Sequence, residues 1–282
     1  MLALAALLLC APVFAQRAVV QPSREETALD QSYSAMYNLN FAEAFQQAES
    51  AKALAKDDPL PWVAEACAQL FREFDRLHIL RSELFASDQK FDARERQAWA
   101  PQAKAQFESE ISGAEKLAQE RLVKNKSDAR SLFALSLCNG LLADDAALIS
   151  KKNLSALSYI KSADSYAERL LALSPDYYDA YVSTGMGKYI IGGKAAPVRW
   201  ILRLDGIKGD QEEGVRELKL ASDHGHYLAP FARILLAFDD LRHKKKADAR
   251  EKLEALHVQF PNNPLFVQEL AKLGHAAAGP GQ

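Results

Sequence analysis

The strongest candidate for metal chemistry is a short stretch in which two histidines, His224 and His226, flank Gly225. Imidazole nitrogens and a carboxylate are common zinc ligands, so these histidines and Asp223 could hold one ion. No fourth ligand lies nearby in the sequence, and Gly225 suits the C-terminal cap of a helix, with His224 as a favourable charge at that end. We therefore predict no metal and no cofactor. A metal-dependent enzyme with a site near His224 and His226 is kept as an alternative.

Two further motifs point to phosphate or serine chemistry, and both are incomplete. The glycine-rich stretch 187–194 approaches a phosphate-binding loop, but Gly193 takes the place of the lysine, and Lys194 is followed by Ala195 and not by the hydroxyl residue that would hold magnesium. Ser158 and Lys161 have the spacing of penicillin-recognising enzymes, but the companion Ser-Asp-Asn and Lys-Thr-Gly elements are absent. The sequence therefore predicts a protein that is not an enzyme.

The charge balance argues against a nucleic-acid partner. The chain has 35 basic and 37 acidic residues, which leaves a formal net charge of −2. A nucleic-acid-binding domain is normally basic, with lysine and arginine gathered on one face. We expect no nucleic-acid partner.

The N-terminal residues resemble an export signal. An apolar run ends at residue 15, and Val13 and Ala15 occupy the positions that a signal peptidase reads, so we predict a signal peptide over 1–15 with cleavage after Ala15. The run is shorter than the roughly 20 residues that span a bilayer, so we expect no stable membrane span after cleavage. A leader over 16–23 would follow, and the mature protein would be periplasmic or secreted. Because no lysine or arginine precedes the apolar run, Met1 is not established as the true start.

The three cysteines leave two questions open. Lipid attachment at Cys10 would need a small preceding residue, and Leu9 is large; an outer-membrane assembly accessory, which would need such a tether, is therefore an alternative only. Cys67 and Cys138 lie in apolar helical contexts, where free cysteine packs as a small hydrophobic residue. Unpaired burial is favoured, although export would permit one disulfide.

The elements that would position any site are helices. Alanine, leucine, lysine and glutamate dominate nearly every segment, and sustained alternation of β-branched residues is missing. A first hairpin is predicted over 24–57, with Ser23 and Glu26 as a capping box and a turn at 38–40. Two later stretches, 163–189 and 230–261, share a spacing of small residues and proline. The residues are Ala163, Pro175 and Gly185 in the first stretch, and Ala237, Ala249 and Pro261 in the second.

This spacing resembles the tetratricopeptide repeat (TPR), a 34-residue pair of helices in which small residues lie where the two helices touch. The resemblance implies an all-α, right-handed α-solenoid of stacked antiparallel helix pairs, with long helices or insertions in units two to four. We expect one TPR-like domain over 24–273 and a disordered tail over 274–282. A final helix over about 265–273 would cap the last exposed apolar face.

The fourth unit departs most from the repeat. Gly185 and its expected counterpart Gly214 lie 29 positions apart instead of twelve, which leaves 17 extra residues. Insertions in repeat proteins often map to the binding face. Alternatively, the apolar residues of the insert lengthen the helix pair and pack inside. The candidate contacts in the insert are Lys194, Arg199, Trp200 and Arg203.

The resemblance also implies a concave groove lined by the first helix of each pair, where a protein or peptide partner binds. Aromatic and methionine side chains suit such recognition because they give a large contact area at low entropic cost. Against this, apolar residues at helical spacing usually form core, and long inserted helices could fill the groove. The oligomeric state is not indicated. The candidate groove residues are Tyr33, Tyr37, Asn139, Val182, Met186, Tyr189, Phe238 and Arg242.

Overall fold

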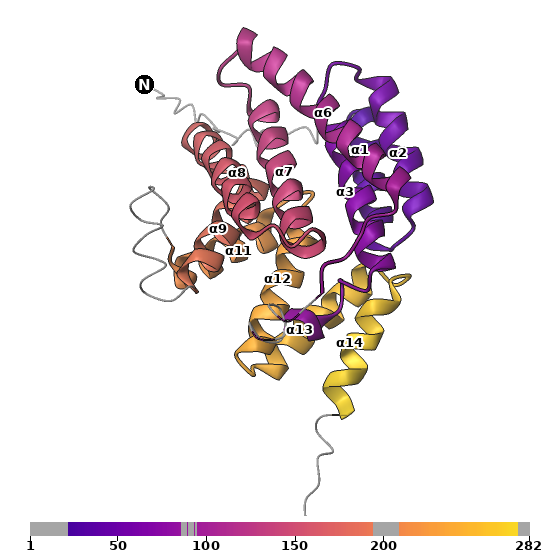
Figure 1. Cartoon of the computed structure of the whole chain (residues 1–282), viewed down its shortest axis with the longest axis vertical. Coiled ribbons are helices and arrows are strands. Elements are labelled where there is room, and N and C mark those ends of the chain that lie inside the picture. Colours follow the sequence, from indigo (N-terminus) through magenta and orange to yellow (C-terminus); the bar gives the residue numbers. More distant parts are fainter. Residues whose placement is uncertain (1–21, 86–88, 90–92, 94, 194–208, 276–282) are drawn as a thin grey trace, which may run out of the picture.

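The computed structural model describes residues 22–85, 89, 93, 95–193 and 209–275, and the regular structure in these ranges is entirely helical (Figure 1). A π-helical turn, η1 (Asp145–Ile149), and a 3-10 turn, η2 (Tyr178–Ala180), accompany the α-helices. The α-helices are α1 (Arg24–Tyr37), α2 (Phe41–Leu54), α3 (Leu60–Arg76), α4 (Ser82–Phe85), α6 (Pro101–Lys124), α7 (Ala129–Asp144), α8 (Asn153–Leu173), α9 (Tyr181–Gly192), α11 (Gln211–His224), α12 (Ala229–Arg242), α13 (Lys246–Gln259) and α14 (Pro264–His275).

Short-range chemistry explains where several helices begin. At the start of α1, the Glu26 amide donates to Ser23 Oγ over 3.1 Å, and the Ser23 amide donates to Glu26 Oε2 over 2.8 Å. This reciprocal pair is the predicted capping box, which satisfies two amides that have no partner in the helix. Pro101 occupies the first turn of α6, where its missing N–H costs nothing. Asp210 accepts from the Glu213 amide over 3.0 Å and so caps α11.

Consecutive helices pack as antiparallel pairs, and the pairs stack. The pairs are α1 with α2, α3 with α6, α7 with α8, α9 with α11, and α12 with α13, and each second helix also contacts the first helix of the next pair. Contacts between α1 and α3, α3 and α7, and α7 and α9 run along the inner layer. The predicted all-α solenoid of helix pairs is thus confirmed, and its right-handed sense stays a prediction. The expected long helices are α6, with 24 residues, and α8, with 21.

The small residues of the fourth pair lie where its two helices touch. A Cβ atom added at Gly214 would lie 2.6 Å from the carbonyl oxygen of Gly185 and 2.7 Å from the backbone nitrogen of Tyr189. A Cβ atom at Gly185 would lie 3.0 Å from the carbonyl oxygen of Gly214. The predicted pairing of Gly185 with Gly214 is therefore confirmed. Ala163, Ala237 and Ala249 are likewise buried.

We expect Gly214→Ala to lower the free energy of unfolding by about 1–3 kcal/mol, because the added methyl group would meet backbone atoms that have no room to move. Gly140→Ala is the matched control: it lies inside α7 with nothing within 4 Å of its added Cβ. That change should stabilise the protein by about 0.5–1 kcal/mol through helix propensity. Urea unfolding of both variants measures the difference, and equal effects would contradict the close helix contact.

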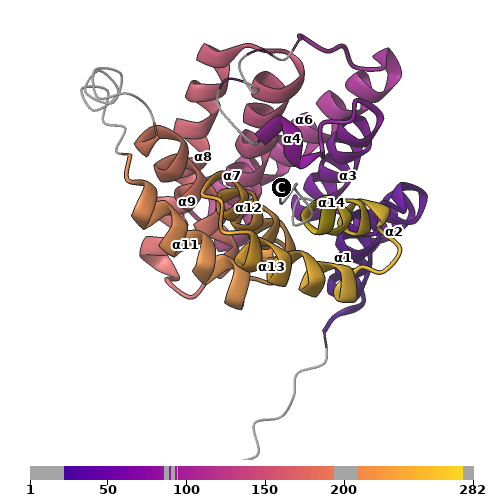
Figure 2. The same ribbon diagram turned by 90° about the horizontal axis from the view of Figure 1, so that it is seen from below.

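The stack curls until its first helix meets its last pairs (Figure 2). Tyr33 of α1 stacks on Tyr227, which precedes α12, with ring centroids 4.9 Å apart. Tyr37 Oη donates to the Tyr227 carbonyl over 3.0 Å, and Asn263, between α13 and α14, donates its side-chain amide to the Tyr37 carbonyl over 2.8 Å. We call this set of contacts the end-to-end closure.

A second set of buried polar contacts holds the turn between α11 and α12. Asp179 of η2 is 4% exposed and accepts hydrogen bonds from three consecutive amides, those of His226 (2.9 Å), Tyr227 (3.2 Å) and Leu228 (2.9 Å). Because Tyr227 is the contact point of α1, Asp179 positions the residue on which the end-to-end closure depends.

A long apolar helical stretch lies at the centre of the stack. Among the described residues, one helical stretch, Ala129–Ile149, is long and apolar enough to cross a membrane by length and composition, with a mean hydropathy of 1.6. It comprises α7 and η1, and 67% of its most apolar window is buried. Since α7 packs against α3, α6, α8 and α9, its position in the core accounts for its apolar sequence.

Candidate functional site

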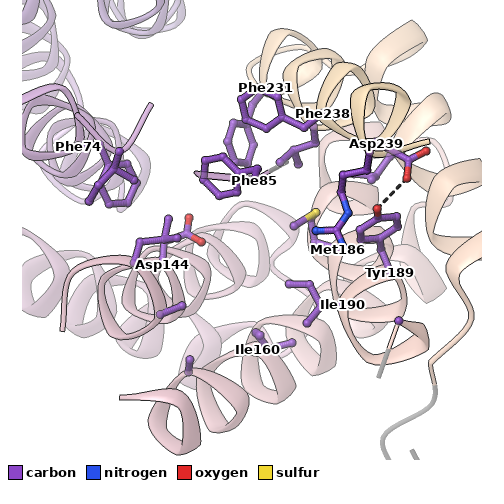
Figure 3. A pocket seen from close by; sticks show the side chains of 18 of the residues that line it. Phe74, Phe85, Asp144, Ile160, Met186, Tyr189, Ile190, Phe231, Phe238 and Asp239 are labelled. Atoms are coloured by element: carbon purple, nitrogen blue, oxygen red, sulfur yellow. Dashed lines mark hydrogen bonds between the residues drawn. The ribbon is translucent and has the colours of Figure 1, made fainter. Parts of the chain in front are cut away.

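A cavity of about 390 Å³ lies inside the curl of the stack, and we call it the inner cavity. Its walls come from α3, α4, α7 with η1, α8, α9, α11 and α12. The lining is predominantly apolar, as is usual for sites that bind apolar groups. Figure 3 shows the side chains converging from the inner helices.

One wall of the inner cavity is aromatic. Phe85 of α4 stacks on Phe238 of α12, with ring centroids 5.0 Å apart and planes 14° apart. Phe231, about two helical turns before Phe238, meets Phe71 of α3 edge to face, with ring centroids 5.8 Å apart. Met186 of α9 lies beside this wall (Figure 3). Phenylalanine and methionine side chains supply large, adaptable contact surfaces for an apolar group.

A polar cluster occupies one end of the cavity. Tyr189 Oη donates to Asp239 Oδ1 over 2.7 Å, and His243 Nδ1 lies 3.1 Å from the same carboxyl oxygen. Arg242, one residue before His243 on α12, also lines the cavity. The Asp239 carboxylate thus already has partners within the protein, Tyr189 and His243.

Asp144 lies on the opposite wall, on α7 (Figure 3). Its side chain makes no capping hydrogen bond, and no hydrogen bond or ion pair to its carboxyl group is present among the described residues. Burial without such a partner disfavours the charged form and raises the pKa of Asp144 to about 7. This carboxyl group is therefore near its titration point at neutral pH.

Four of the eight predicted groove residues meet at this cavity: Met186, Tyr189, Phe238 and Arg242. They come from α9 and α12, the first helices of the two pairs whose spacing most resembles the repeat. That these residues contact a partner stays a prediction.

The other four groove residues do not line the cavity. Tyr33 and Tyr37 are each 5% exposed because they form the end-to-end closure, and Val182 is 6% exposed within the core. Asn139 donates its side-chain amide to the Leu135 carbonyl in its own helix over 2.8 Å. The expectation that the three buried residues line an open groove is corrected here: the chain itself covers them.

The insert residues Lys194, Arg199, Trp200 and Arg203 lie outside the described residues. The two ends of the insert, however, are held together. A Cβ atom added at Gly209 would lie 2.4 Å from the backbone nitrogen of Gly192, and the Asp210 amide donates to the Lys188 carbonyl over 3.1 Å. The residues that flank the insert therefore lie side by side, where Gly193 and Gln211 line the cavity.

The two histidines that suggested a metal site face different partners. His226 Nε2 lies 2.7 Å from Asp30 Oδ1, and the His224 ring packs against Tyr178 with centroids 4.8 Å apart. Gly225 is the C-terminal cap of α11, as the alternative explanation of this stretch predicts. No cluster of three or more potential metal ligands occurs in the part of the chain that the structure describes.

Cys67 and Cys138 are both free and buried, as favoured from the sequence. Burial in the apolar core raises the pKa of the Cys67 thiol to about 12 and that of Cys138 well above its usual value. Neither cysteine is therefore a ready nucleophile, because the thiolate is the reactive form.

The sequence predictions missed the residues that complete the cavity, namely Phe71, Phe85, Phe231, Asp144 and Asp239. A signal was available for Asp144, which with Asp145 interrupts a run of apolar residues on a helix that reads as core. No comparable signal existed for Phe85, since α4 has only four residues and faces α12 from a distant part of the sequence.

The comparisons with known proteins find a similarity in structure and none in sequence families. No family model and no curated protein matches the chain. Among solved structures, the chain is similar to a thermophilic TPR protein of Thermus thermophilus, with a TM-score of 0.47 and 14% sequence identity over 89% of this chain and 99% of that one. Because this similarity is low, the helix-pair arrangement rests on the contacts within this chain.

Proposed function

We propose that this protein is a non-enzymatic helical scaffold that binds a peptide segment of another protein, and that the inner cavity receives a bulky apolar side chain of that segment. The observation that carries the proposal is the convergence of Phe85, Phe231, Phe238 and Met186 around a preformed space of about 390 Å³. A cavity lined by aromatic and methionine side chains gains free energy when an apolar group displaces water from it.

Peptide selection tests this proposal. A library of random peptides displayed on phage is selected against the purified full chain, and the affinities of enriched peptides are measured by calorimetry. Phe238→Ala removes a wall of the cavity and should weaken binding at least about tenfold, the scale of one lost aromatic anchor. Val258→Ala is the control, because Val258 is 81% exposed on α13 and should leave affinity unchanged.

A second variant separates a loss of peptide binding from a loss of the fold. Met186→Trp adds bulk inside the cavity without removing core, and should block the enriched peptides while circular dichroism and the unfolding midpoint stay close to those of the wild type. Failure to enrich any peptide, or peptides whose affinity is the same for Phe238→Ala, Met186→Trp and the wild type, would refute the proposal.

The proposed setting of this activity is the bacterial envelope or the space outside the cell, after cleavage behind Ala15. Support comes from the apolar run over 2–15 and the small residues at its end. Mass spectrometry of the mature N-terminus tests it directly. A chain that begins at Gln16 supports export in soluble form, lipidated Cys10 supports an outer-membrane assembly accessory, and an intact Met1 refutes export.

A further inference from the structure

The inner cavity has an unbalanced set of charges. The described residues that line it include two carboxyl groups, those of Asp144 and Asp239, against one basic group, the guanidinium of Arg242. Asp239 already accepts a hydrogen bond from Tyr189, and Arg242 has interactions of its own. Asp144 is the acid whose carboxyl group has no hydrogen-bond or ion-pair partner in the described part of the chain.

The position of Asp144 favours a cationic partner. Asp144 lines the same space as Phe71, Phe74 and Phe85. Figure 3 shows Asp144 on the side of the cavity that faces Phe74 and Phe85. Aromatic faces attract cations through their quadrupole, and a buried carboxylate gains most from a partner that both neutralises it and donates a hydrogen bond to it. An acidic group placed here would instead meet like charge in an apolar space, which is unfavourable.

We propose that the inner cavity selects peptide segments in which a lysine or arginine lies next to the inserted apolar residue, and that Asp144 is the group that pairs with this base. The inference rests on the proposed function and specifies its partner as a basic-apolar segment. In this arrangement the aromatic wall supplies affinity, whereas Asp144 supplies selectivity.

The titration of Asp144 gives this pairing a pH dependence. With a pKa of about 7, Asp144 carries little charge at pH 6 and is mostly ionised at pH 8. The charged groups that share the cavity with Asp144 are Asp239 and Arg242. Cys67 of α3 also lies near Asp144, but its thiol is neutral over this range because burial raises its pKa to about 12. His243 of α12 contacts Asp239 at the far wall. A basic peptide should therefore bind up to about tenfold more tightly at pH 8 than at pH 6.

The test uses matched peptides on the full chain. Peptides enriched by the wild type should contain lysine or arginine beside a bulky apolar residue, and replacing that base with glutamine should weaken binding about tenfold. Asp144→Asn should reduce this preference to about twofold or less while it keeps the affinity for the glutamine peptide. Asp176→Asn, an exposed aspartate in the turn before η2, should keep the full preference.

The outcomes separate the two proposals. Enriched peptides without a basic residue, or a preference that Asp144→Asn leaves intact, would overturn the role of Asp144 while the peptide-binding function stands. Absence of any bound peptide would overturn both. The pH dependence is an independent readout: a tenfold gain between pH 6 and pH 8 that disappears in Asp144→Asn supports the pairing, and an equal gain in both proteins contradicts it.

Discussion

Replacing Asp179 with alanine is expected to lower the free energy of unfolding by about 3–5 kcal/mol, because each amide left without a partner costs about 1–3 kcal/mol. The Asp179 carboxyl group accepts from three consecutive amides, two of which belong to the buried residues Tyr227 and Leu228. Within the described residues, these amides have no other acceptor. Thermal and urea unfolding measure the loss.

Two variants test the cause of this effect. Asp179→Asn keeps an oxygen that can accept from His226 and Leu228 but turns an amide group toward the Tyr227 amide, so its loss should be smaller than that of alanine. Asp176→Ala removes an exposed aspartate from the turn before η2 and should change stability by less than about 0.5 kcal/mol. Equal losses for all three would show that the three amide contacts do not hold the turn.

Asp144→Asn is expected to stabilise the protein increasingly as the pH rises. Burial raises the pKa of Asp144 from 3.8 to about 7, so between these values the folded protein holds a proton that the unfolded chain releases. The stability of the wild type therefore falls as pH rises from about 4 to 7 and then levels off. Asparagine does not titrate, so its advantage over aspartate should grow by about 2–4 kcal/mol between pH 4 and pH 8.

Urea unfolding of both proteins at pH 4, 6 and 8 measures this difference. The comparison between pH values removes the fixed cost of placing an amide in the cavity, which does not depend on pH. A difference that stays constant across the range would show that Asp144 has an ordinary pKa. A confirmed trend would mean that a destabilising carboxyl group is retained in the cavity, as is common for groups that bind or react.

The helix pairs could be predicted from the sequence because their signals are local. The capping box at Ser23 and Glu26, the proline at 101 and the spacing of Gly185 depend on neighbours along the chain or on one adjacent helix. The resemblance to the repeat likewise pointed to Met186 and Phe238, which both line the cavity. Such features recur at fixed intervals along the sequence, so they can be recognised without knowledge of the tertiary structure.

The features that could not be predicted from the sequence depend on how far the stack of helix pairs curls. Tyr33 and Tyr37 lie on the inner face of α1, as the repeat predicts, but the curl brings Tyr227 and Phe260 against them. The same curl places α4 against α12 and so encloses the aromatic wall around Phe238. Small rotations between successive pairs set this curvature, and their sum over the whole stack is not encoded in any single spacing. A groove predicted from the repeat is therefore a cavity in this chain.

The end-to-end closure changes how the protein should come apart. In an open array of repeats, the outermost unit has one neighbour and frays first, and melting then spreads inward. Here Tyr37 joins the first helix to the loops on both sides of the last pair, so removal of either terminal unit also breaks contacts made by the other. Amide hydrogens of α1 and α13 should accordingly exchange together, in one cooperative opening. The first helix and the last helix pair should then unfold as one unit.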